Sequence, residues 1–340
     1  MRVLLTGNRG YIGVEMVPAL RAAGHEVVGM DIGLFDACDF SSAPDPIDTL
    51  PVDLRDVTAD DLEGFDAIAH FGALSNDPLG DINADLTYDI NLHASVRLAE
   101  AAKVAGIERF VFASSCSLYG AGGDDYLDET ADFFPQTPYG ESKVRVEQEL
   151  SKLADDSFSP CYLRNATAYG VSRRLRADIV VNSLVGHAVT TGKVLLMSDG
   201  SPWRPLVHIG DIIGATVACL AAPRDAMHNE AFNVGRNGEN YQIRTVAEMV
   251  RDTVPDCELA FADGASSDTR DYKVDFTKIE SKLPGFESQW TLQQGIEELY
   301  HAYTGAGLDE ADWTGPRYYR LPTVMNLVDA GVLDQDLRRT

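Results

Sequence analysis

The chain has 340 residues, a formal net charge of -25 and a sequence pI near 4.5. Its summed field repels nucleic acid and anionic membranes, so these partners are excluded, and a phosphate-bearing ligand must be held by local positive charge. The five cysteines lack a C-x-x-C spacing and the seven histidines lack a metal-ligand spacing, which indicates reduced thiols, no metal site and a cytoplasmic protein. The longest mildly apolar stretch, residues 212–222, is too short to span a bilayer.

Apolar runs alternate with helical stretches through the first half of the chain, which is the pattern of a parallel α/β sheet. Strands are predicted at residues 2–7, 25–31, 51–54, 65–73, 108–115 and 161–170, with helices at 11–23, 83–105 and 138–154. Beyond residue 170 the pattern is more mixed, with a helix at 178–191, a strand and a helix within 206–222, a strand at 231–235, and helices at 245–253 and 291–304. The sequence therefore predicts a Rossmann-type doubly wound parallel sheet with a smaller C-terminal substrate-binding lobe.

The segment TGNRGYIG, residues 6–13, follows the first strand and opens the first helix. Its glycines let the backbone turn tightly and approach a diphosphate, whose charge the helix N-terminus stabilises. Asp31 ends the second strand, eighteen residues after Gly13, where a carboxylate accepts hydrogen bonds from a ribose 2′-hydroxyl and repels the 2′-phosphate of NADP. This pattern predicts NAD as the cofactor. Asp53, at the end of the third strand, is a candidate acceptor for the adenine amino group, and a solvated strand-end acid is the alternative.

The segment PYGESK, residues 138–143, places Tyr139 and Lys143 one helical turn apart. Of the thirteen tyrosines only Tyr139 has a lysine four positions later, although an ordinary surface pair has the same spacing. An ammonium about 6 Å from a phenol, at an effective dielectric near 20, interacts by roughly 3 kcal/mol, which lowers the tyrosine pKa by about two units. A phenol with a pKa of about 8 is a usable general base for a hydroxyl or general acid for a ketone.

Together these segments resemble the extended short-chain dehydrogenase/reductases that act on nucleotide sugars. TGNRGYIG is similar to the cofactor turn of that family, SSCSLYG (residues 114–120) to its serine motif and PYGESK to its Y-x-x-x-K motif, and the resemblance runs from residue 1 to about residue 300. It implies that Tyr139 is the acid/base, that Lys143 binds the nicotinamide ribose, and that Ser115 hydrogen-bonds the reacting sugar oxygen. The implied cofactor-binding residues are Gly7, Gly10, Tyr11, Ile12, Gly13, Asp31, Asp53, Leu54, Asn91 and Lys143.

The resemblance also implies a site for a nucleotide-diphosphate sugar in the second half of the chain. The implied substrate-binding residues are Thr167, Asn182, Arg204 and Arg270. Charge points the same way, because residues 165–210 hold five bases (Arg173, Arg174, Arg176, Lys193 and Arg204) against two acids (Asp178 and Asp199). The net charge of this stretch is therefore +3, and a chance cluster of bases on a helix face is the alternative explanation.

The reaction is the least determined part of the prediction. The resembling 4,6-dehydratases carry an Asp-Glu pair directly after the Ser/Thr, and a decarboxylase would carry a glutamate at Ser117, whereas this chain has Cys116 and Ser117. A 4-epimerase needs one base, retained NADH and room for the ketosugar to turn over, so we predict an NAD-dependent nucleotide-sugar epimerase acting at C4. Many 4-epimerases have asparagine where this chain has Thr167. The alternatives are an NAD-dependent 4-ketosugar reductase, a nucleotide-sugar dehydratase, or an NAD-sensing scaffold without catalysis.

The organisation along the chain follows from these assignments. Residues 1–170 are predicted to form the NAD-binding domain with a return segment at about 205–235, and residues 171–304 to form mainly the substrate-binding lobe. Residues 305–340 are a C-terminal extension of unknown role, for which a packed extension and a partly disordered tail are both compatible with the sequence. The family resemblance implies a homodimer formed through the helices at 83–105 and 138–154.

Overall fold

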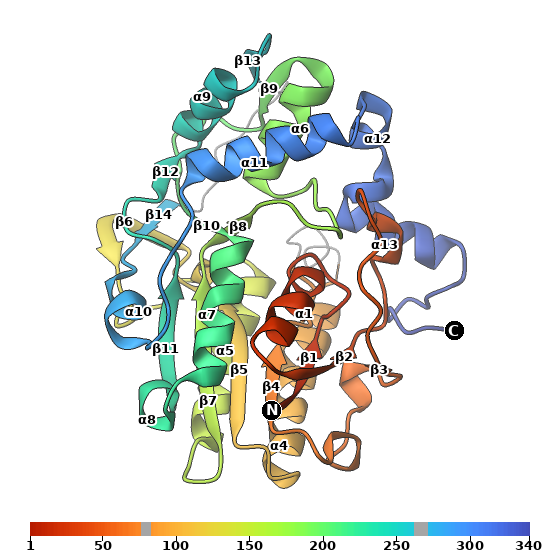
Figure 1. Ribbon diagram of the computed structural model, residues 1–340, viewed down its shortest axis with the longest axis vertical. Helices are drawn as coiled ribbons and strands as arrows, with labels where there is room; N and C mark the ends of the chain where they lie inside the picture. Colours follow the sequence, from red (N-terminus) through yellow and green to blue (C-terminus); the bar gives the residue numbers. More distant parts are fainter. Residues whose placement is uncertain (76–82, 262–270) are drawn as a thin grey trace.

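The centre of the computed structural model, which describes residues 1–75, 83–261 and 271–340, is a seven-stranded parallel sheet (Figure 1). The strand order is β11-β7-β5-β4-β1-β2-β3, so the direction of winding reverses between β1 and β4. Such a reversal leaves a crevice at the carboxyl ends of the strands. The strands are β1 (Arg2–Thr6), β2 (Glu26–Met30), β3 (Thr49–Leu50), β4 (Ala67–His70), β5 (Arg109–Ser115), β7 (Ser159–Asn165) and β11 (Glu230–Val234). The predicted Rossmann-type sheet is confirmed.

Helices cover both faces of this sheet. On one face lie α1 (Gly13–Ala22) and α7 (Ile209–Ala221), and on the other lie α4 (Ala94–Val104) and α5 (Pro138–Leu153) (Figure 1). Consecutive residues of a strand point to opposite faces, yet Val3, Leu4 and Leu5 of β1 are all fully buried. Burial on both faces is the reason that these strands read as continuous apolar runs in the sequence.

A second lobe lies above the carboxyl ends of the central strands (Figure 1). Its apolar core is packed between α6 (Val180–Thr191), α9 (Ile243–Thr253) and α11 (Leu292–Gly305). Short strand groups connect it to the sheet: β8 (Thr167–Tyr169) with β10 (Trp203–His208) and β12 (Asn240–Gln242), β9 (Lys193–Leu196) with β13 (Glu258–Phe261), and β6 (Ala121–Leu127) with β14 (Asp271–Val274). Two short helices, α8 (Arg224–Met227) and α10 (Thr277–Lys282), pack near β11.

Three predicted elements differ from the structure. The strand expected at 161–170 is broken at Ala166, because β7 stays in the central sheet while β8 pairs with β10. The helix expected at 83–105 consists of α3 (Ala84–Thr87), a π-helical turn at Tyr88–His93 and α4. The strand expected at 51–54 is wrong: β3 ends before Pro51, which cannot donate to a ladder, and Leu54–Asp56 form a 3-10 turn capped by the Asp53 side chain.

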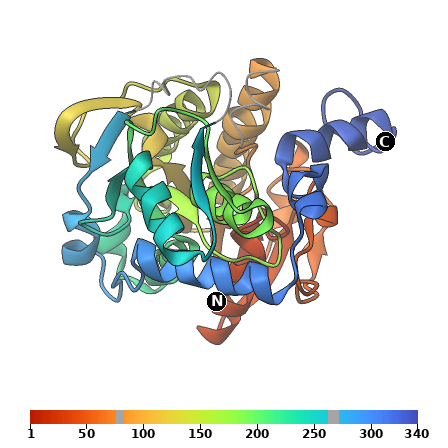
Figure 2. The ribbon, with the colours of Figure 1, turned by 90° about the horizontal axis from the view of Figure 1, so that it is seen from above.

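The C-terminal extension is packed, which decides between the two alternatives left by the sequence. Its helix α12 (Glu310–Thr314) packs against α6, and α13 (Arg320–Asp329) lies beside the segment that follows β2; Figure 2 shows this blue end of the chain next to the red N-terminal part. Val324 of α13 packs in a small apolar cluster with Leu34 and Leu74. The last residues continue along the same side, where the Arg55 guanidinium donates to the Asp336 carbonyl at 2.6 Å.

None of the helices within the described ranges combines the length and apolar character that a bilayer crossing requires. Within the same ranges, no three His, Cys, Asp or Glu side chains gather in a way that could hold a metal ion. The five cysteines are all free thiols.

Candidate active site

A cavity of about 1250 Å³ lies at the carboxyl edge of the sheet, between the sheet and the second lobe. It brings together residues from the first glycine turn to the C-terminal extension. The predicted site residues that line it are Gly7, Gly10, Tyr11, Ile12, Gly13, Asp31, Asp53, Leu54, Ser115, Tyr139, Lys143, Thr167 and Arg204. Asn91 and Asn182 are not part of its lining, and Arg270 lies outside the described residues.

The glycine turn has the geometry of a diphosphate cradle. Gly7 has a positive φ of +73°, and a Cβ on Gly13 would lie 2.0 Å from the Gly7 carbonyl oxygen, so neither position accepts a side chain without distortion. The N–H groups of Tyr11, Ile12 and Gly13 find no acceptor in the part of the chain that the structure describes. Free N–H groups at the start of α1, facing a cavity, fit the diphosphate of a dinucleotide.

Asp31 is fixed at the end of β2 by two backbone hydrogen bonds. Its carboxylate accepts from the N–H of Gly33 at 2.7 Å and from the N–H of Arg9 at 3.1 Å. Burial is the largest influence on this carboxyl group and raises its pKa, while the two backbone donors oppose the rise. A partly buried, oriented carboxylate in this position fits a pair of ribose hydroxyls and disfavours a 2′-phosphate.

Asp53 lines the cavity but is already engaged. The Arg55 guanidinium donates to both carboxylate oxygens, at 2.9 and 2.7 Å, and the Arg55 N–H donates at 2.9 Å. Burial alone would raise the pKa of Asp53, but the hydrogen bonds from Arg55 outweigh burial and lower it. Contact with an adenine amino group stays a prediction, and Asp53 would make it while holding Arg55.

The catalytic candidates come from two neighbouring elements. Ser115 ends β5, and its hydroxyl accepts from the Ser117 N–H at 3.2 Å. Tyr139 and Lys143 are on the first turns of α5, which begins at Pro138 after the capping side chain of Thr137. A strand end and a helix start meeting at the cavity place a hydroxyl, a phenol and an amine along one wall.

Lys143 is almost completely buried beside Tyr139. Its Nζ donates to the Ala113 carbonyl at 2.7 Å and lies 5.4 Å from the centroid of the Tyr139 ring, close to the separation expected from helical spacing. Burial lowers the pKa of Lys143 to about 7, and the Glu147 carboxylate offsets only part of this effect. The sequence predicted an ammonium next to the phenol, and the burial of Lys143 makes this ammonium a stronger acid than that of an exposed lysine.

This lowered pKa leads to a prediction about stability. The folded state disfavours the Lys143 cation, so burying it destabilises the cofactor-free protein. This destabilisation is complete below pH 7. It disappears as the pH rises toward 10.5, because the lysine of the unfolded chain then loses its proton as well. We expect Lys143→Met to raise the free energy of unfolding by on the order of 3 kcal/mol at pH 6 and by little near pH 10. Urea unfolding of the variant and the wild type at both pH values measures this difference. An increase in the free energy of unfolding that is the same at both pH values would contradict the prediction.

Two predicted amides lie behind the cavity wall. Asn91 is in the π-helical turn, where its side chain accepts from the Leu74 N–H at 2.8 Å and donates to the Leu74 carbonyl at 2.9 Å. Asn182 of α6 is fully buried, accepts from the Gly170 N–H and donates to the Tyr11 hydroxyl. These contacts do not test the predicted cofactor contact by Asn91 or the predicted substrate contact by Asn182, and both stay predictions. Each amide shapes the site through the residues that it holds.

The basic stretch at 165–210 contributes only in part. Arg173 and Arg174 form ion pairs with Glu15 and Asp39 away from the cavity, whereas Arg204 and Arg176 line it.

Sequence reasoning missed the contribution of the C-terminal extension. Tyr319 and Arg320 also line the cavity, together with Leu34 and Phe35 of the segment after β2. The tail has no motif that could have indicated this, because only tertiary packing brings it to the site.

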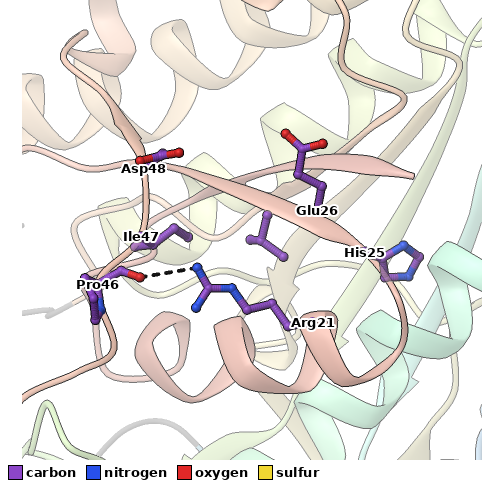
Figure 3. A pocket seen from close by; sticks show the side chains of 7 residues that line it. Arg21, His25, Glu26, Pro46, Ile47 and Asp48 are labelled. Carbon is purple, nitrogen blue, oxygen red and sulfur yellow. Dashed lines mark hydrogen bonds between the residues drawn. The ribbon is translucent and has the colours of Figure 1, made fainter.

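A second hollow of about 330 Å³ lies elsewhere, at the amino end of β2 (Figure 3). It is formed by the end of α1, the start of β2 and the loop before β3. The Arg21 guanidinium points across it and donates to the Pro46 carbonyl at 3.2 Å. None of the predicted site residues lies there, and it is on the side of the sheet away from the carboxyl ends.

Comparison with known proteins agrees with this arrangement. The UDP-glucose 4-epimerase of Mycolicibacterium smegmatis is 29% identical over 310 residues, covering 87% of this chain and 96% of that protein. The UDP-glucose 4-epimerase of Bacillus subtilis is 27% identical over 331 residues, covering 88% and 94%. Among solved structures, MoeE5 in complex with UDP-glucuronic acid and NAD superposes with a TM-score of 0.78 at 27% identity, covering 90% of this chain and 100% of that one.

The profile of one family spans the glycine turn, both catalytic elements and the last strand of the central sheet, matching residues 3–235. This match covers more than half of the chain. The chain therefore belongs to the NAD dependent epimerase/dehydratase family.

Proposed function

We propose that this protein is an NAD-dependent epimerase that inverts C4 of a UDP-sugar. The observation that carries the proposal is the gathering of Ser115, Tyr139 and Lys143 along one wall of a cavity that also contains the glycine turn and Asp31. The relatives named UDP-glucose 4-epimerase support the choice of base and of stereocentre. NAD is the cofactor, as in the family as a whole.

The chain's own residues supply the proton transfer and the positioning. Bound NAD would accept a hydride from the sugar carbon and later return it. We propose that Tyr139 removes the hydroxyl proton and gives it back after the 4-ketosugar has turned over, while Ser115 hydrogen-bonds the same oxygen. Lys143, held by the Ala113 carbonyl, orients the nicotinamide ribose and stabilises the tyrosinate when protonated.

The cavity favours epimerisation over dehydration. Elimination of water requires an acid and a base in addition to Tyr139. Cys116 is fully buried, and its thiol, whose pKa burial raises strongly, contacts the Arg164 carbonyl. Within the described part of the chain the acids that line the cavity are Asp31, Asp53 and Asp178; the first two belong to the adenosine end, and the third is bound to Arg176. In the described ranges, no pair of acids lines the cavity beside Ser115.

The substrate is proposed to lie between the sheet and the second lobe. Thr167 and Arg204 line the cavity on this side, and Arg204 is 6% exposed, which suits a cation that contacts a ligand diphosphate. We accordingly assign residues 1–170, with the return segment at about 205–235, to NAD binding and residues 171–304 mainly to substrate binding.

The function is tested by incubating the purified protein, without added cofactor, with a panel of UDP-, dTDP-, GDP- and CDP-sugars and identifying the products by NMR. Interconversion of UDP-glucose and UDP-galactose is the expected result. A free 4-keto product would favour a dehydratase, and a requirement for added NADH would favour a 4-ketosugar reductase. No turnover of any sugar by protein that contains bound NAD would favour the scaffold alternative.

We also propose that the protein is a cytoplasmic homodimer. The helices that would form the interface, α4 and α5, lie on the same face of the sheet, and the Tyr88 hydroxyl bridges to Glu141 between their segments at 2.8 Å. Light scattering should give a molar mass of twice 37.0 kDa. Cell fractionation tests the location, and a monomeric mass would contradict the dimer.

A further inference from the structure

Arg320, the first residue of α13, is a buried cation without an acidic partner. It is 3% exposed and lines the large cavity, and within the described ranges no carboxylate lies within 4.0 Å of it. Its Nη1 has no hydrogen-bond partner there, and its Nη2 donates only to the Arg174 carbonyl at 3.3 Å. Burial, followed by the charge of Arg176, lowers the pKa of Arg320 to about 10. A cation in such surroundings is stabilised by binding an anion.

The neighbouring positive charges are already neutralised. Arg174 forms an ion pair with Asp39 at 2.7 Å, and Arg176 forms one with Asp178 at 2.9 Å. Arg320 is therefore the positive charge that remains in this group. The Ser172 hydroxyl accepts from the Arg174 N–H at 3.0 Å and donates to the Tyr11 carbonyl at 2.7 Å, so the segment that Arg320 contacts is also bonded to the glycine turn.

The cavity would receive two diphosphates, that of NAD and that of the nucleotide sugar. The position of Arg320 indicates which of the two it contacts. Its guanidinium lies 4.2 Å from the ring centroid of Phe35, in the segment that follows β2 and Asp31. This is the adenosine side of the cavity, whereas Arg204, the candidate for the substrate diphosphate, is on β10 of the other lobe. The carboxylate of Asp31 disfavours a 2′-phosphate close by.

We propose that Arg320 binds the diphosphate of NAD together with the glycine turn, so that the C-terminal extension is part of the cofactor site. The inference rests on the proposed function only in taking NAD as the cofactor. It gives a role to residues that carry no motif.

The end of the chain holds this extension in place around the adenosine side. The Arg339 Nε donates to the Ile32 carbonyl at 2.5 Å, next to Asp31, and Arg338 forms an ion pair with Asp56 at 2.5 Å. The Arg55 guanidinium, which binds Asp53, also donates to the Asp336 carbonyl at 2.6 Å. These links connect the extension to the loops after β2 and β3, so Arg320 is held at the cavity before any ligand binds, and less ordering entropy is lost on binding.

Arg320→Gln, Arg320→Lys and the control Arg251→Gln test the proposal. Arg251 is an exposed arginine in the last turn of α9, paired with Asp252 and not part of the cavity lining, and its replacement by glutamine changes the net charge equally. Dissociation constants of cofactor-free protein would be measured for NAD and ADP-ribose, which contain the diphosphate, and for adenosine, which does not. Melting temperatures would be recorded with and without NAD.

We expect Arg320→Gln to weaken NAD and ADP-ribose binding by roughly 10- to 100-fold and to leave adenosine binding unchanged. Arg320→Lys should retain part of the affinity, and Arg251→Gln should match the wild type. Because the cation is buried without a partner, the cofactor-free Arg320→Gln protein should melt at the wild-type temperature or above, and its stabilisation by NAD should be smaller.

NAD affinity within twofold of wild type in Arg320→Gln would overturn the proposal. Equal weakening of adenosine and NAD, with a lower melting temperature of the cofactor-free protein, would also overturn it by revealing a structural role. These readouts do not require catalysis. If the wild type binds NAD with the expected dependence on Arg320 but converts no nucleotide sugar, the proposed function fails and this inference stands.

Discussion

Replacing Tyr139 with phenylalanine is expected to reduce kcat for UDP-sugar epimerisation by about 10²- to 10⁴-fold, the usual contribution of a positioned acid/base group. The substitution removes only the hydroxyl oxygen, so the ring and its contact with Lys143, 5.4 Å from the ring centroid, are retained. Affinity for NAD should therefore change little, and the loss should appear in kcat. NMR measurement of product formation, with a parallel NAD titration, checks both parts of this expectation.

The matched control is Tyr300→Phe, which removes a phenol from α11 at a position that does not line the cavity. It should retain wild-type turnover. Tyr139→Phe protein that still binds NAD and turns over at a rate within threefold of wild type would show that the phenol is not the base, and with it the proposed mechanism would fail.

Replacing Glu147 with glutamine is expected to lower the free energy of unfolding by about 3–5 kcal/mol, because it leaves a buried guanidinium without its counter-charge. Arg164 and Glu147 form an ion pair at 2.7 Å with side chains only 6% and 7% exposed. The pair also fixes residues next to the site. Glu147 accepts from the Ser114 hydroxyl at 2.5 Å, and Arg164 donates to the Tyr119 hydroxyl at 3.1 Å. Activity should fall as well, since Ser114 immediately precedes Ser115.

Shifts of the midpoint of urea unfolding measure this loss of stability. Two further variants test whether the loss comes from the buried ion pair. Glu149→Gln breaks an exposed pair with Lys152 on the same helix and should cost no more than about 1 kcal/mol. The double variant Glu147→Leu/Arg164→Met removes both buried charges and should recover much of the stability lost by Glu147→Gln. Equal midpoints for Glu147→Gln and Glu149→Gln would contradict the assigned role of the buried pair.

The predicted site residues that the structure brings together at the cavity are encoded within short continuous segments. Tyr139 and Lys143 are one turn apart on one helix, and their mutual position depends only on the pitch of α5. The glycine turn is similarly local, since Gly7 and Gly13 contact each other across a single loop. Helical and strand periodicity also predicted the central sheet, because burial on both faces leaves apolar runs that are visible in the sequence.

Contacts with distant partners are not visible in the sequence. Asn91 and Asn182 are predicted to contact ligands, and the structure adds that their amides accept from backbone N–H groups of other segments, at Leu74 and Gly170. The break of the strand at Ala166 depends on pairing between β8 and β10, which are separated by α6 and β9. No local pattern contains this information.

The sequence by itself determined the class of fold, the cofactor turn and the Tyr139 and Lys143 pair, since each follows from steric and periodic rules within about twenty residues. The tertiary structure decided which of the clustered arginines reach the cavity, the protonation behaviour of Lys143, and the approach of Arg320 to the cofactor side. Burial and charge neutralisation set these properties. Both depend on contacts between segments that meet only when the whole chain is folded, such as the contacts of β5 with α5 and of Phe35 with α13.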